Sequence, residues 1–170
     1  MSIRALDRYY RRSTKNLRVL CNRGLNGIDG TLSSAIGAAQ AYRQTTLITG
    51  DLALLHDTTA FAFQNEMRVR EMQGEGTAPS IIVVLLNNNG GAIFDILPQK
   101  SQDAYFERLF LTPQNVNYKA IAPAFGVPSQ RARSLAAFRQ AYAEFLEQPG
   151  INLIEIPLAL AGVEARYRLP

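Results

Sequence analysis

Short apolar runs separated by polar loops dominate the pattern of the chain. Residues 46–49 and 81–86 are apolar or β-branched at every position, which is typical of strands in a parallel sheet covered on both faces. Residues 18–21 and 152–156 are mostly apolar, with a few polar positions, and also have the pattern of strands. The sequence therefore predicts a sheet built from these strands.

Between these runs, apolar residues recur at helical spacing. The pattern predicts helices over residues 3–10, 31–42, 52–63, 104–111, 118–125 and 135–146. Residues 64–80 are polar and contain glycines and a proline, so we expect a surface loop with no more than an extra helical turn there. The alternation of strands and helices predicts an α/β fold, a doubly wound, mostly parallel sheet with helices on both faces.

Two of the predicted strands end at polar loops. Gly50 and Asp51 follow the first strand, and residues 87–91, Asn-Asn-Asn-Gly-Gly, follow the second. Ligands of open α/β sheets bind beyond the carboxyl ends of the strands, so the two loops can converge on one point. Oxygen ligands of this kind suit Mg²⁺ or Ca²⁺ better than zinc. The alternative is that Asp51 only caps the following helix, because Asp is a favoured N-cap residue.

Two further segments are candidates for ligand contact. The loop at residues 22–30 holds Gly24, Gly27 and Gly30, and glycines permit positive φ and close approach of the backbone to a ligand. An apolar shelf follows the asparagines, and core packing and a platform for a heterocycle are equally favoured for it. Its members are Ile93, Phe94, Ile96 and Leu97.

Composition is that of a globular protein. With 170 residues, 47% of them hydrophobic and 19% charged, we expect residues 1–170 to form a single domain. The sequence has no apolar run near the roughly 18 residues of a membrane helix and no signal-peptide pattern, so a cytoplasmic location is expected. The lone Cys21 excludes an intramolecular disulfide, and with one histidine, His56, a zinc site is disfavoured. We expect Cys21 to be buried at a strand end and His56 to be structural.

The net charge of +4 is concentrated near the N-terminus. A basic arm of this kind can bind nucleic acid, but no nucleic-acid-binding motif accompanies it. We favour a solvated helix face or a surface that contacts another domain, and we expect neither nucleic acid nor a membrane as a partner. The basic residues are Arg4, Arg8, Arg11, Arg12, Lys15, Arg18 and Arg23.

Three blocks of sequence carry a family resemblance. Residues 22–33 read NRGLNGIDGTLS, residues 50–57 read GDLALLHD, and residues 87–94 read NNNGGAIF. Gly-Asp, a helix, and an apolar strand ending in Asn-Asn resemble the signature of thiamine diphosphate enzymes. Together the blocks resemble the 2-succinyl-5-enolpyruvyl-6-hydroxy-3-cyclohexene-1-carboxylate synthases of menaquinone and phylloquinone synthesis. The resemblance covers nearly the whole chain but only the last, diphosphate-binding domain of that three-domain enzyme, and the interval from Asp51 to Asn88 is longer than usual for the motif.

The resemblance implies a set of site residues. Mg²⁺, or Mn²⁺ in its place, would be held against the diphosphate by Asp51, the side-chain carbonyl of Asn88 and the backbone carbonyl of Gly90. Ile28 would lie under the cofactor and enforce its bent conformation, and Arg23 and Arg4 would meet substrate carboxylates. The remaining cofactor contacts would be Gly50, Leu52, Ala53, Ile93, Phe94 and Leu97.

The resemblance also implies an activity that this chain does not complete. The family decarboxylates 2-oxoglutarate and adds the succinyl carbanion to isochorismate, and its activating glutamate belongs to the N-terminal domain of a neighbouring subunit. We therefore expect no catalytic residue in this chain, binding without turnover, and either a homo-oligomer or a separate N-terminal domain as partner. Two alternatives stay open: another thiamine diphosphate enzyme, such as a relative of acetolactate synthase, and a non-catalytic interaction module that keeps the fold.

Overall fold

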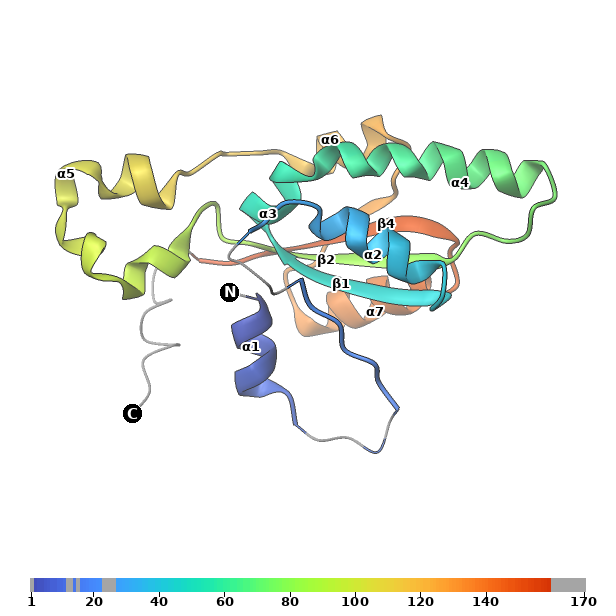
Figure 1. Cartoon of the computed structure of the whole chain (residues 1–170), viewed down its shortest axis with the longest axis horizontal. Helices are drawn as coiled ribbons and strands as arrows, with labels where there is room; N and C mark the ends of the chain where they lie inside the picture. The colour runs from blue at the N-terminus through green and yellow to red at the C-terminus, as the bar shows by residue number, and fades with distance from the viewer. Residues whose placement is uncertain (1, 12–13, 15, 23–26, 160–170) are drawn as a thin grey trace.

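A parallel sheet forms the centre of the molecule (Figure 1). The computed structural model describes residues 2–11, 14, 16–22 and 27–159. The four strands of the sheet lie in the order β1-β2-β4-β3, and each neighbouring pair is parallel. Their carboxyl ends therefore share one edge. The strands are β1 (Gln44–Gly50), β2 (Ser80–Asn87), β3 (Ser129–Arg131) and β4 (Gly150–Pro157).

Helices cover both faces of the sheet (Figure 1). One face packs against α2 (Thr31–Ala39), α3 (Asp51–His56), α4 (Phe63–Met72) and α6 (Tyr118–Ala124). The other packs against α7 (Leu135–Leu146). Successive residues of β2 alternate between the two cores, Ile81 and Val83 to the first and Ile82 and Val84 to the second, because neighbouring side chains of a strand point to opposite faces. The expected α/β fold with helices on both faces is confirmed.

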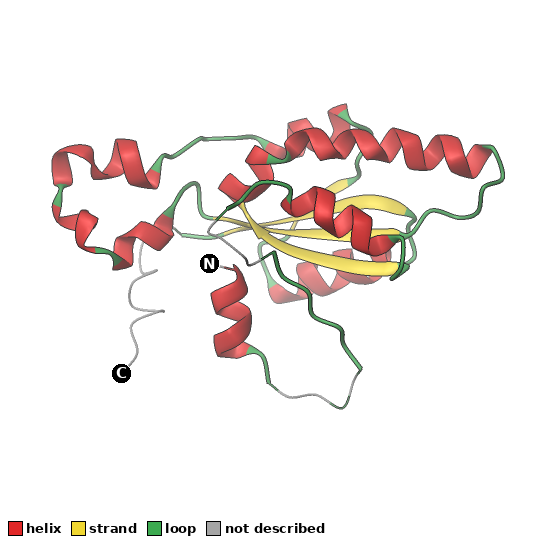
Figure 2. Ribbon diagram, in the orientation of Figure 1, coloured by secondary structure: helices red, strands yellow, loops and turns green. Residues whose placement is uncertain are grey.

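A run of short helices beyond the carboxyl ends of the strands forms a projection that we call the helical arm, residues 92–111 (Figure 2). Phe94 packs edge-on against Phe110, with ring centroids 5.6 Å apart, and Phe106 stacks on Phe110 at 5.8 Å. These rings give the arm a small apolar centre of its own. The arm consists of η2 (Ala92–Ile96), η3 (Pro98–Ser101), α5 (Asp103–Phe106) and η4 (Glu107–Leu111).

The predicted surface loop at residues 64–80 is wrong over its first half. Phe63–Met72 form α4, and only residues 73–79 lie between it and β2. Gln64 and Met67 are both buried and lie on one side of this helix. Their spacing escaped detection because Gln64 is polar: its Oε1 accepts the buried N–H of Ile151 at 2.6 Å. The long interval between Asp51 and Asn88 therefore contains a packed helix.

The predicted strand at residues 18–21 is also wrong. Residues 16–22 have no regular secondary structure, and Leu17, Val19 and Leu20 are exposed. Cys21, expected to be buried, is exposed. Residues that favour strands form one only where a neighbouring strand supplies hydrogen bonds. Among the described residues β1, at the edge of the sheet, pairs with β2 alone, so residues 18–21 have no strand partner.

The predicted helix at residues 52–63 is interrupted at Asp57. The chain there passes from α3 into a 3₁₀ turn, η1 (Thr58–Ala62), and then into α4. The Asp57 carboxylate accepts from the backbone N–H of Ser33 at 2.7 Å and from its hydroxyl at 3.0 Å, which ties the first turn of α2 to the end of α3.

The other predicted helices are confirmed, with small shifts at their ends. The first is α1 (Ser2–Tyr9), and residues 104–111 fall in α5 and η4. The Ser134 hydroxyl caps α7 by accepting from Ala137 N at 3.1 Å. Across the described part of the chain, no helix has the length and apolar character to span a membrane.

Candidate functional site

Asp51 and the asparagine loop, residues 87–91, meet at the carboxyl ends of β1 and β2. The two strands are adjacent and in register, with Gly50 beside Leu86, so the segments that follow them leave the sheet at the same edge. The backbone N–H of Gly90 donates to Asp51 Oδ2 at 2.8 Å. The two loops that the sequence places after neighbouring strands are thus joined directly.

Both carboxylate oxygens of Asp51 accept backbone N–H groups. Oδ1 accepts from Leu52 at 2.8 Å, and the residue is 6% exposed. Burial raises the pKa of the carboxyl, and the hydrogen bonds from Gly90 and Leu52 oppose that shift. Asp51 was expected at the N-cap of the following helix, but that position belongs to Gly50, whose backbone is extended. The bond to Gly90 reaches outside the helix, which capping alone does not explain.

Tyr118 holds the backbone of Asp51 through a hydrogen bond. Its hydroxyl donates to the backbone carbonyl of Asp51 at 2.8 Å, and both groups are buried. Burial, and then the nearby charges of Asp51 and Glu155, raise the pKa of the phenol, so it remains a protonated donor. Sequence reasoning identified only a helix at Tyr118. The available signal was that a buried tyrosine hydroxyl generally requires a hydrogen-bond partner.

The turn of the asparagine loop depends on positive φ angles. Asn89 has φ 60° and Gly90 has φ 148°. A Cβ atom on Gly90 would lie 2.4 Å from the carbonyl oxygen of Leu111, so glycine is required there for space as well as for conformation. Within this turn the side-chain amide of Asn88 donates to the carbonyl of Gly90 at 2.9 Å. The Asn88 side chain and the Gly90 carbonyl, both expected to bind metal, are therefore in direct contact with each other.

The end of the helical arm and the segment that follows it are hydrogen-bonded to the asparagine loop. Asn89 and Asn115 form a reciprocal pair: the Asn89 amide donates to Asn115 Oδ1 and the Asn115 backbone N–H donates to Asn89 Oδ1, both at 2.8 Å. The N–H of Gly91 donates to Leu111 O at 2.7 Å. Nothing in the sequence pattern identified Asn115, because its contribution depends on a contact between loops far apart in the chain.

A buried acid lies beneath the same loop. Glu155 of β4 is 3% exposed, and its Oε1 accepts from the side-chain amide of Asn87 at 2.8 Å. Its other oxygen, Oε2, accepts from Arg131 Nε at 2.9 Å. Sequence reasoning missed this network as part of the site. The sequence feature that could have indicated this network is a carboxylate, Glu155, within a mostly apolar strand, because a buried charge requires partners.

The apolar residues expected around the cofactor differ in exposure. Ile28 is 44% exposed and Leu97 is 39% exposed, whereas Ile93 and Phe94 are half-buried. Phe94 contributes one ring to the aromatic centre of the arm, so core packing accounts for part of the shelf. Gly50, Leu52 and Ala53, the other expected contacts, are half-buried around Asp51.

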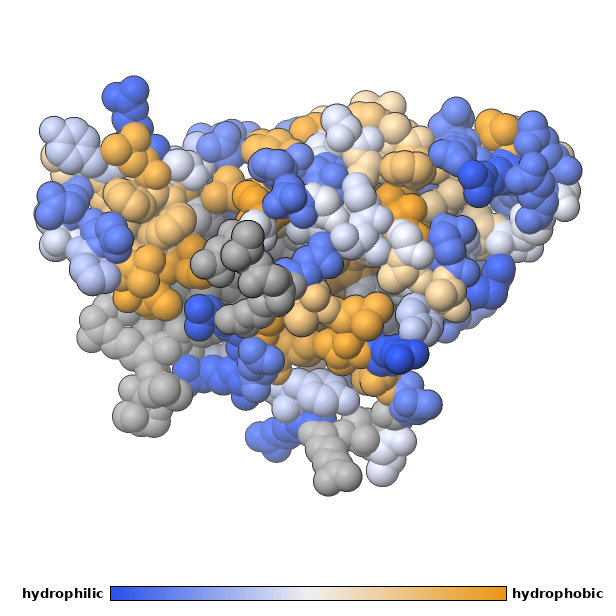
Figure 3. Space-filling view, in the orientation of Figure 1, coloured by the Kyte–Doolittle hydropathy of each residue, from blue (hydrophilic) through white to orange (hydrophobic). Residues whose placement is uncertain are grey.

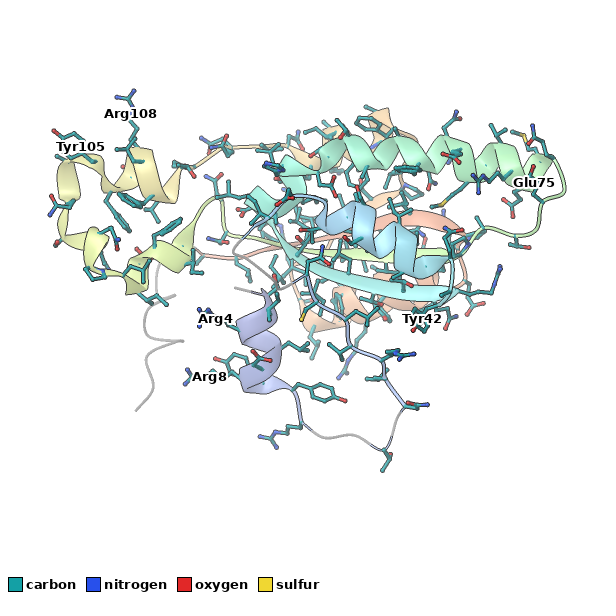
Figure 4. The ribbon with its side chains drawn as sticks, viewed as in Figure 1. Arg4, Arg8, Tyr42, Glu75, Tyr105 and Arg108 are labelled. Atoms are coloured by element: carbon teal, nitrogen blue, oxygen red, sulfur yellow. The ribbon has the colours of Figure 1, made fainter. Side chains whose placement is uncertain are left out.

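The expected substrate arginines are described only in part. Arg4 is exposed on α1, where it projects from the same side of the helix as Arg8 (Figure 4). Arg23 lies outside the described residues. His56 is exposed at the end of α3.

Comparison with known proteins places this geometry in a family. Residues 2–156 match the family described as "Thiamine pyrophosphate enzyme, C-terminal TPP binding domain". The chain belongs to this family. Thiamine pyrophosphate is the same compound as thiamine diphosphate, so the resemblance drawn from the three sequence blocks is confirmed.

The relatives of this thiamine-diphosphate-binding chain include many synthases. The 2-succinyl-5-enolpyruvyl-6-hydroxy-3-cyclohexene-1-carboxylate synthase of Bacillus pumilus is 37% identical over 157 residues, which are 92% of this chain and 25% of the relative. Those of Acaryochloris marina (38% over 156 residues; 92% and 25%) and Trichodesmium erythraeum (33% over 169 residues; 99% and 27%) are similar. The chain thus spans about a quarter of the length of the curated relatives it matches.

A solved structure supports the fold. The thiamine diphosphate-dependent 4-hydroxybenzoylformate decarboxylase of Rhodococcus jostii RHA1 superposes with a TM-score of 0.60 at 20% identity, covering 76% of this chain and 23% of that one. At this identity the likeness concerns the arrangement of strands and helices alone.

The chemistry around Asp51 fits the metal expected in a diphosphate-binding site. Its buried carboxylate is bonded to neutral N–H groups and forms no ion pair with another described residue. The loop bonded to Asp51 through the Gly90 N–H also carries the Gly90 carbonyl and the Asn88 amide, which are hydrogen-bonded to each other. Carboxylate, amide and carbonyl oxygens are the ligands that Mg²⁺ prefers. No group of three His, Cys, Asp or Glu side chains in the described residues offers a metal site, so a cation here would depend on these mixed oxygens.

Proposed function

We propose that the chain is the diphosphate-binding part of a synthase that decarboxylates 2-oxoglutarate and joins the remaining succinyl unit to isochorismate, a transferase of quinone biosynthesis. Relatives carrying that synthase name, 33–38% identical over nearly all of this chain, support the choice of reaction. The order of the three sequence blocks in this chain agrees with that choice.

In this proposal the two loops hold the metal and the diphosphate. Asp51, the side-chain oxygen of Asn88 and the carbonyl of Gly90 bind Mg²⁺, and Mn²⁺ is an acceptable substitute because it favours similar oxygen ligands. Gly50, Leu52 and Ala53 would line the diphosphate, and the N–H groups of the first turn of α3 other than that of Leu52, which is bonded to Asp51, would be available to its negative charge. The observation that carries the proposal is the hydrogen bond from Gly90 to Asp51, which holds the two loops together.

The remaining site residues act on the organic part of the cofactor and on the substrates. Thiamine diphosphate, when bound, supplies the carbanion chemistry that decarboxylation requires. Ile28 would lie under the cofactor and favour its bent conformation, and Ile93, Phe94 and Leu97 would flank its pyrimidine. Arg4 and Arg23 bind substrate carboxylates, for which the guanidinium fork is suited.

Calorimetry tests the binding part of the proposal. The chain is titrated with thiamine diphosphate in the presence of Mg²⁺ and again in the presence of a chelator, and Asp51→Ala is compared with the parent. We expect binding that requires Mg²⁺ and is lost in Asp51→Ala. Binding that ignores the chelator, or an alanine variant that binds as well as the parent, would contradict the clamp.

A second experiment tests the reaction. Because the activating glutamate of the family lies in an N-terminal domain, we propose that this chain binds without turnover and completes its site with another subunit or a separate N-terminal partner in the cytoplasm. Carbon dioxide release from 2-oxoglutarate plus isochorismate is measured with and without a supplied N-terminal domain. We expect release only with that domain. Release from pyruvate instead would favour an acetolactate synthase-like enzyme.

A further inference from the structure

A series of hydrogen bonds between polar groups runs across the sheet from β3 to the asparagine loop. Arg131 on β3 donates through Nε to Glu155 Oε2 on β4 at 2.9 Å. Glu155 Oε1 accepts from the side-chain amide of Asn87 at the end of β2, at 2.8 Å. Asn87 Oδ1 in turn accepts the backbone N–H of Asn89 at 3.0 Å. Every step joins neighbouring elements, and the last one reaches the turn that carries Asn88 and Gly90.

The chemistry of the two ends allows only one orientation of the Asn87 amide. An ionised carboxylate accepts hydrogen bonds and does not donate them, so the NH₂ group of Asn87 must face Glu155. A backbone N–H only donates, so the oxygen of Asn87 must face Asn89. The charge of Glu155, which is 3% exposed and paired with Arg131, therefore determines which atom Asn87 presents to the turn.

The turn that Asn87 supports is one that needs support. Asn89 has φ 60°, and a non-glycine residue holds such a conformation only when its surroundings fix it. Its backbone N–H is bonded to Asn87, and its side chain is bonded to Asn115. The position of the following Gly90 carbonyl depends on this conformation.

We propose that Glu155, held by Arg131, is a positioning residue for the metal-holding turn and acts on it through Asn87. The inference rests on the proposed function for its metal, but the geometry of the turn can be measured without any ligand. Partners that orient metal ligands typically contribute about 10- to 100-fold in metal affinity when removed. Glu155 would therefore tune Mg²⁺ binding without touching the cation.

The first test replaces Glu155→Gln and measures two quantities on the full chain. One is the hydrogen exchange of the Asn89 and Gly90 amides without ligand. The other is the Mg²⁺ affinity at a fixed, saturating concentration of thiamine diphosphate. A glutamine presents an NH₂ group in place of one of the two carboxylate oxygens that accept from Asn87 and Arg131, and it loses the charge that pairs with Arg131. We therefore expect faster exchange at the turn and about 10- to 100-fold weaker Mg²⁺ binding. The amide of Ile154, in the interior of β4, should keep its protection.

Glu144→Gln provides the matched control. Glu144 Oε2 accepts from the side-chain amide of Gln130 of β3 at 2.9 Å, in an exposed pair beside the same strand that carries Arg131. This pair does not reach the asparagine loop, so the variant should match the parent in both measurements. Equal effects of the two substitutions would overturn the inference.

A double variant separates positioning through Asn87 from general support of the sheet. Asn87→Ala should weaken Mg²⁺ binding to a similar degree, and adding Glu155→Gln to it should weaken binding no further. Additive losses, or a Glu155→Gln chain with parent-like exchange and affinity, would refute the inference. If Glu155→Gln does not fold, Arg131→Met, which removes the group that holds Glu155, takes its place, and parent-like exchange of the Asn89 amide in that variant would overturn the inference. A parent chain that binds no cofactor with Mg²⁺ would contradict the proposed function, whereas the exchange measurement would still test the role of Glu155.

Discussion

At the scale of single residues, Asp51 combines two properties that oppose each other. Its carboxylate is buried, which disfavours the charge, yet both of its oxygens accept N–H groups, which favours it. Burial has the larger effect, so its pKa is raised above the ordinary value of 3.8. A cation bound at this position would favour the ionised form.

This conflict predicts a pH dependence of stability. Because the folded state holds the proton of Asp51 more tightly than the unfolded state, its contribution to the free energy of unfolding falls as pH rises from about 3.8 through the raised pKa. Asp51→Asn removes this fall. We expect the stability difference, parent minus variant, to decline over that pH range in denaturant titrations. At neutral pH, Mg²⁺ with thiamine diphosphate should stabilise the parent and not the variant. A pH-independent difference would contradict the burial argument.

Gly90 predicts a second effect at this scale. Gly90→Ala places a Cβ atom 2.4 Å from the Leu111 carbonyl, in addition to the strain of a positive φ. Gly74 is the matched control, because it has φ 77° and open space around its Cα. Gly74→Ala should cost about 1–3 kcal/mol in the free energy of unfolding from backbone strain alone. Gly90→Ala should cost more and abolish Mg²⁺-dependent cofactor binding, and equal losses in urea denaturation would show that the loop tolerates the contact.

At the scale of elements, α4 lengthens the interval between Asp51 and the asparagine loop, and the two loops are still joined by the bond from Gly90 to Asp51. It packs through Gln64 and Met67 on the first core, and it lies on the face of the sheet opposite α7 (Figure 1). Gln64 also approaches β4 closely, since a Cβ atom on Gly150 would lie 2.7 Å from its side-chain oxygen. The packing of α4 on β4 therefore depends on a polar side chain that fits against a glycine.

Gln64→Ala should accordingly destabilise the sheet. The substitution leaves the buried N–H of Ile151 without its acceptor, which costs about 1–3 kcal/mol in the free energy of unfolding. Asn65→Ala, at the exposed neighbouring position of the same helix, should change stability by no more than about 0.5 kcal/mol. Urea denaturation of the two variants measures the difference. Equal stability of the two variants would show that Gln64 contributes no more to folding than an exposed residue of the same helix.

At the scale of the whole molecule, the helical arm carries apolar surface beside the site. Ile96, Leu97, Tyr105 and Leu109 of the arm are exposed, and the space-filling view shows apolar surface over this end of the molecule (Figure 3). Exposed apolar patches of this kind are typical of protein interfaces. The proposed partner, a second subunit or a separate N-terminal domain, would cover this surface.

This surface predicts self-association of the isolated chain. Leu109, 60% exposed, is replaced by lysine, and sedimentation measures the association constant. We expect about a tenfold loss, the equivalent of ~1.4 kcal/mol of buried apolar contact. Met72→Lys is the control, because Met72 is also exposed but lies at the end of α4, near Glu75 and away from Tyr105 of the arm (Figure 4). A chain that stays monomeric, or equal losses in both variants, would argue against an interface at the arm.

The sequence by itself determined the elements whose signals are local. Short apolar runs identified β1, β2 and β4, helical spacing identified α2, α6 and α7, and the polar residues after β1 and β2 identified Asp51 and the asparagine loop. The convergence of those loops follows from parallel strands alone, because neighbouring parallel strands end at the same edge. The family resemblance needed no more than the order of three short blocks.

The tertiary structure decided everything that depends on a partner distant in the chain. Residues 18–21 have the composition of a strand but no hydrogen-bonding neighbour, and α4 was hidden because its buried Gln64 is satisfied by β4. Tyr118, Asn115 and Glu155 support the site through hydrogen bonds to residues 67, 26 and 68 positions away. Such bonds leave no periodic trace in a sequence, because whether a buried polar group is satisfied is settled by what the fold brings beside it.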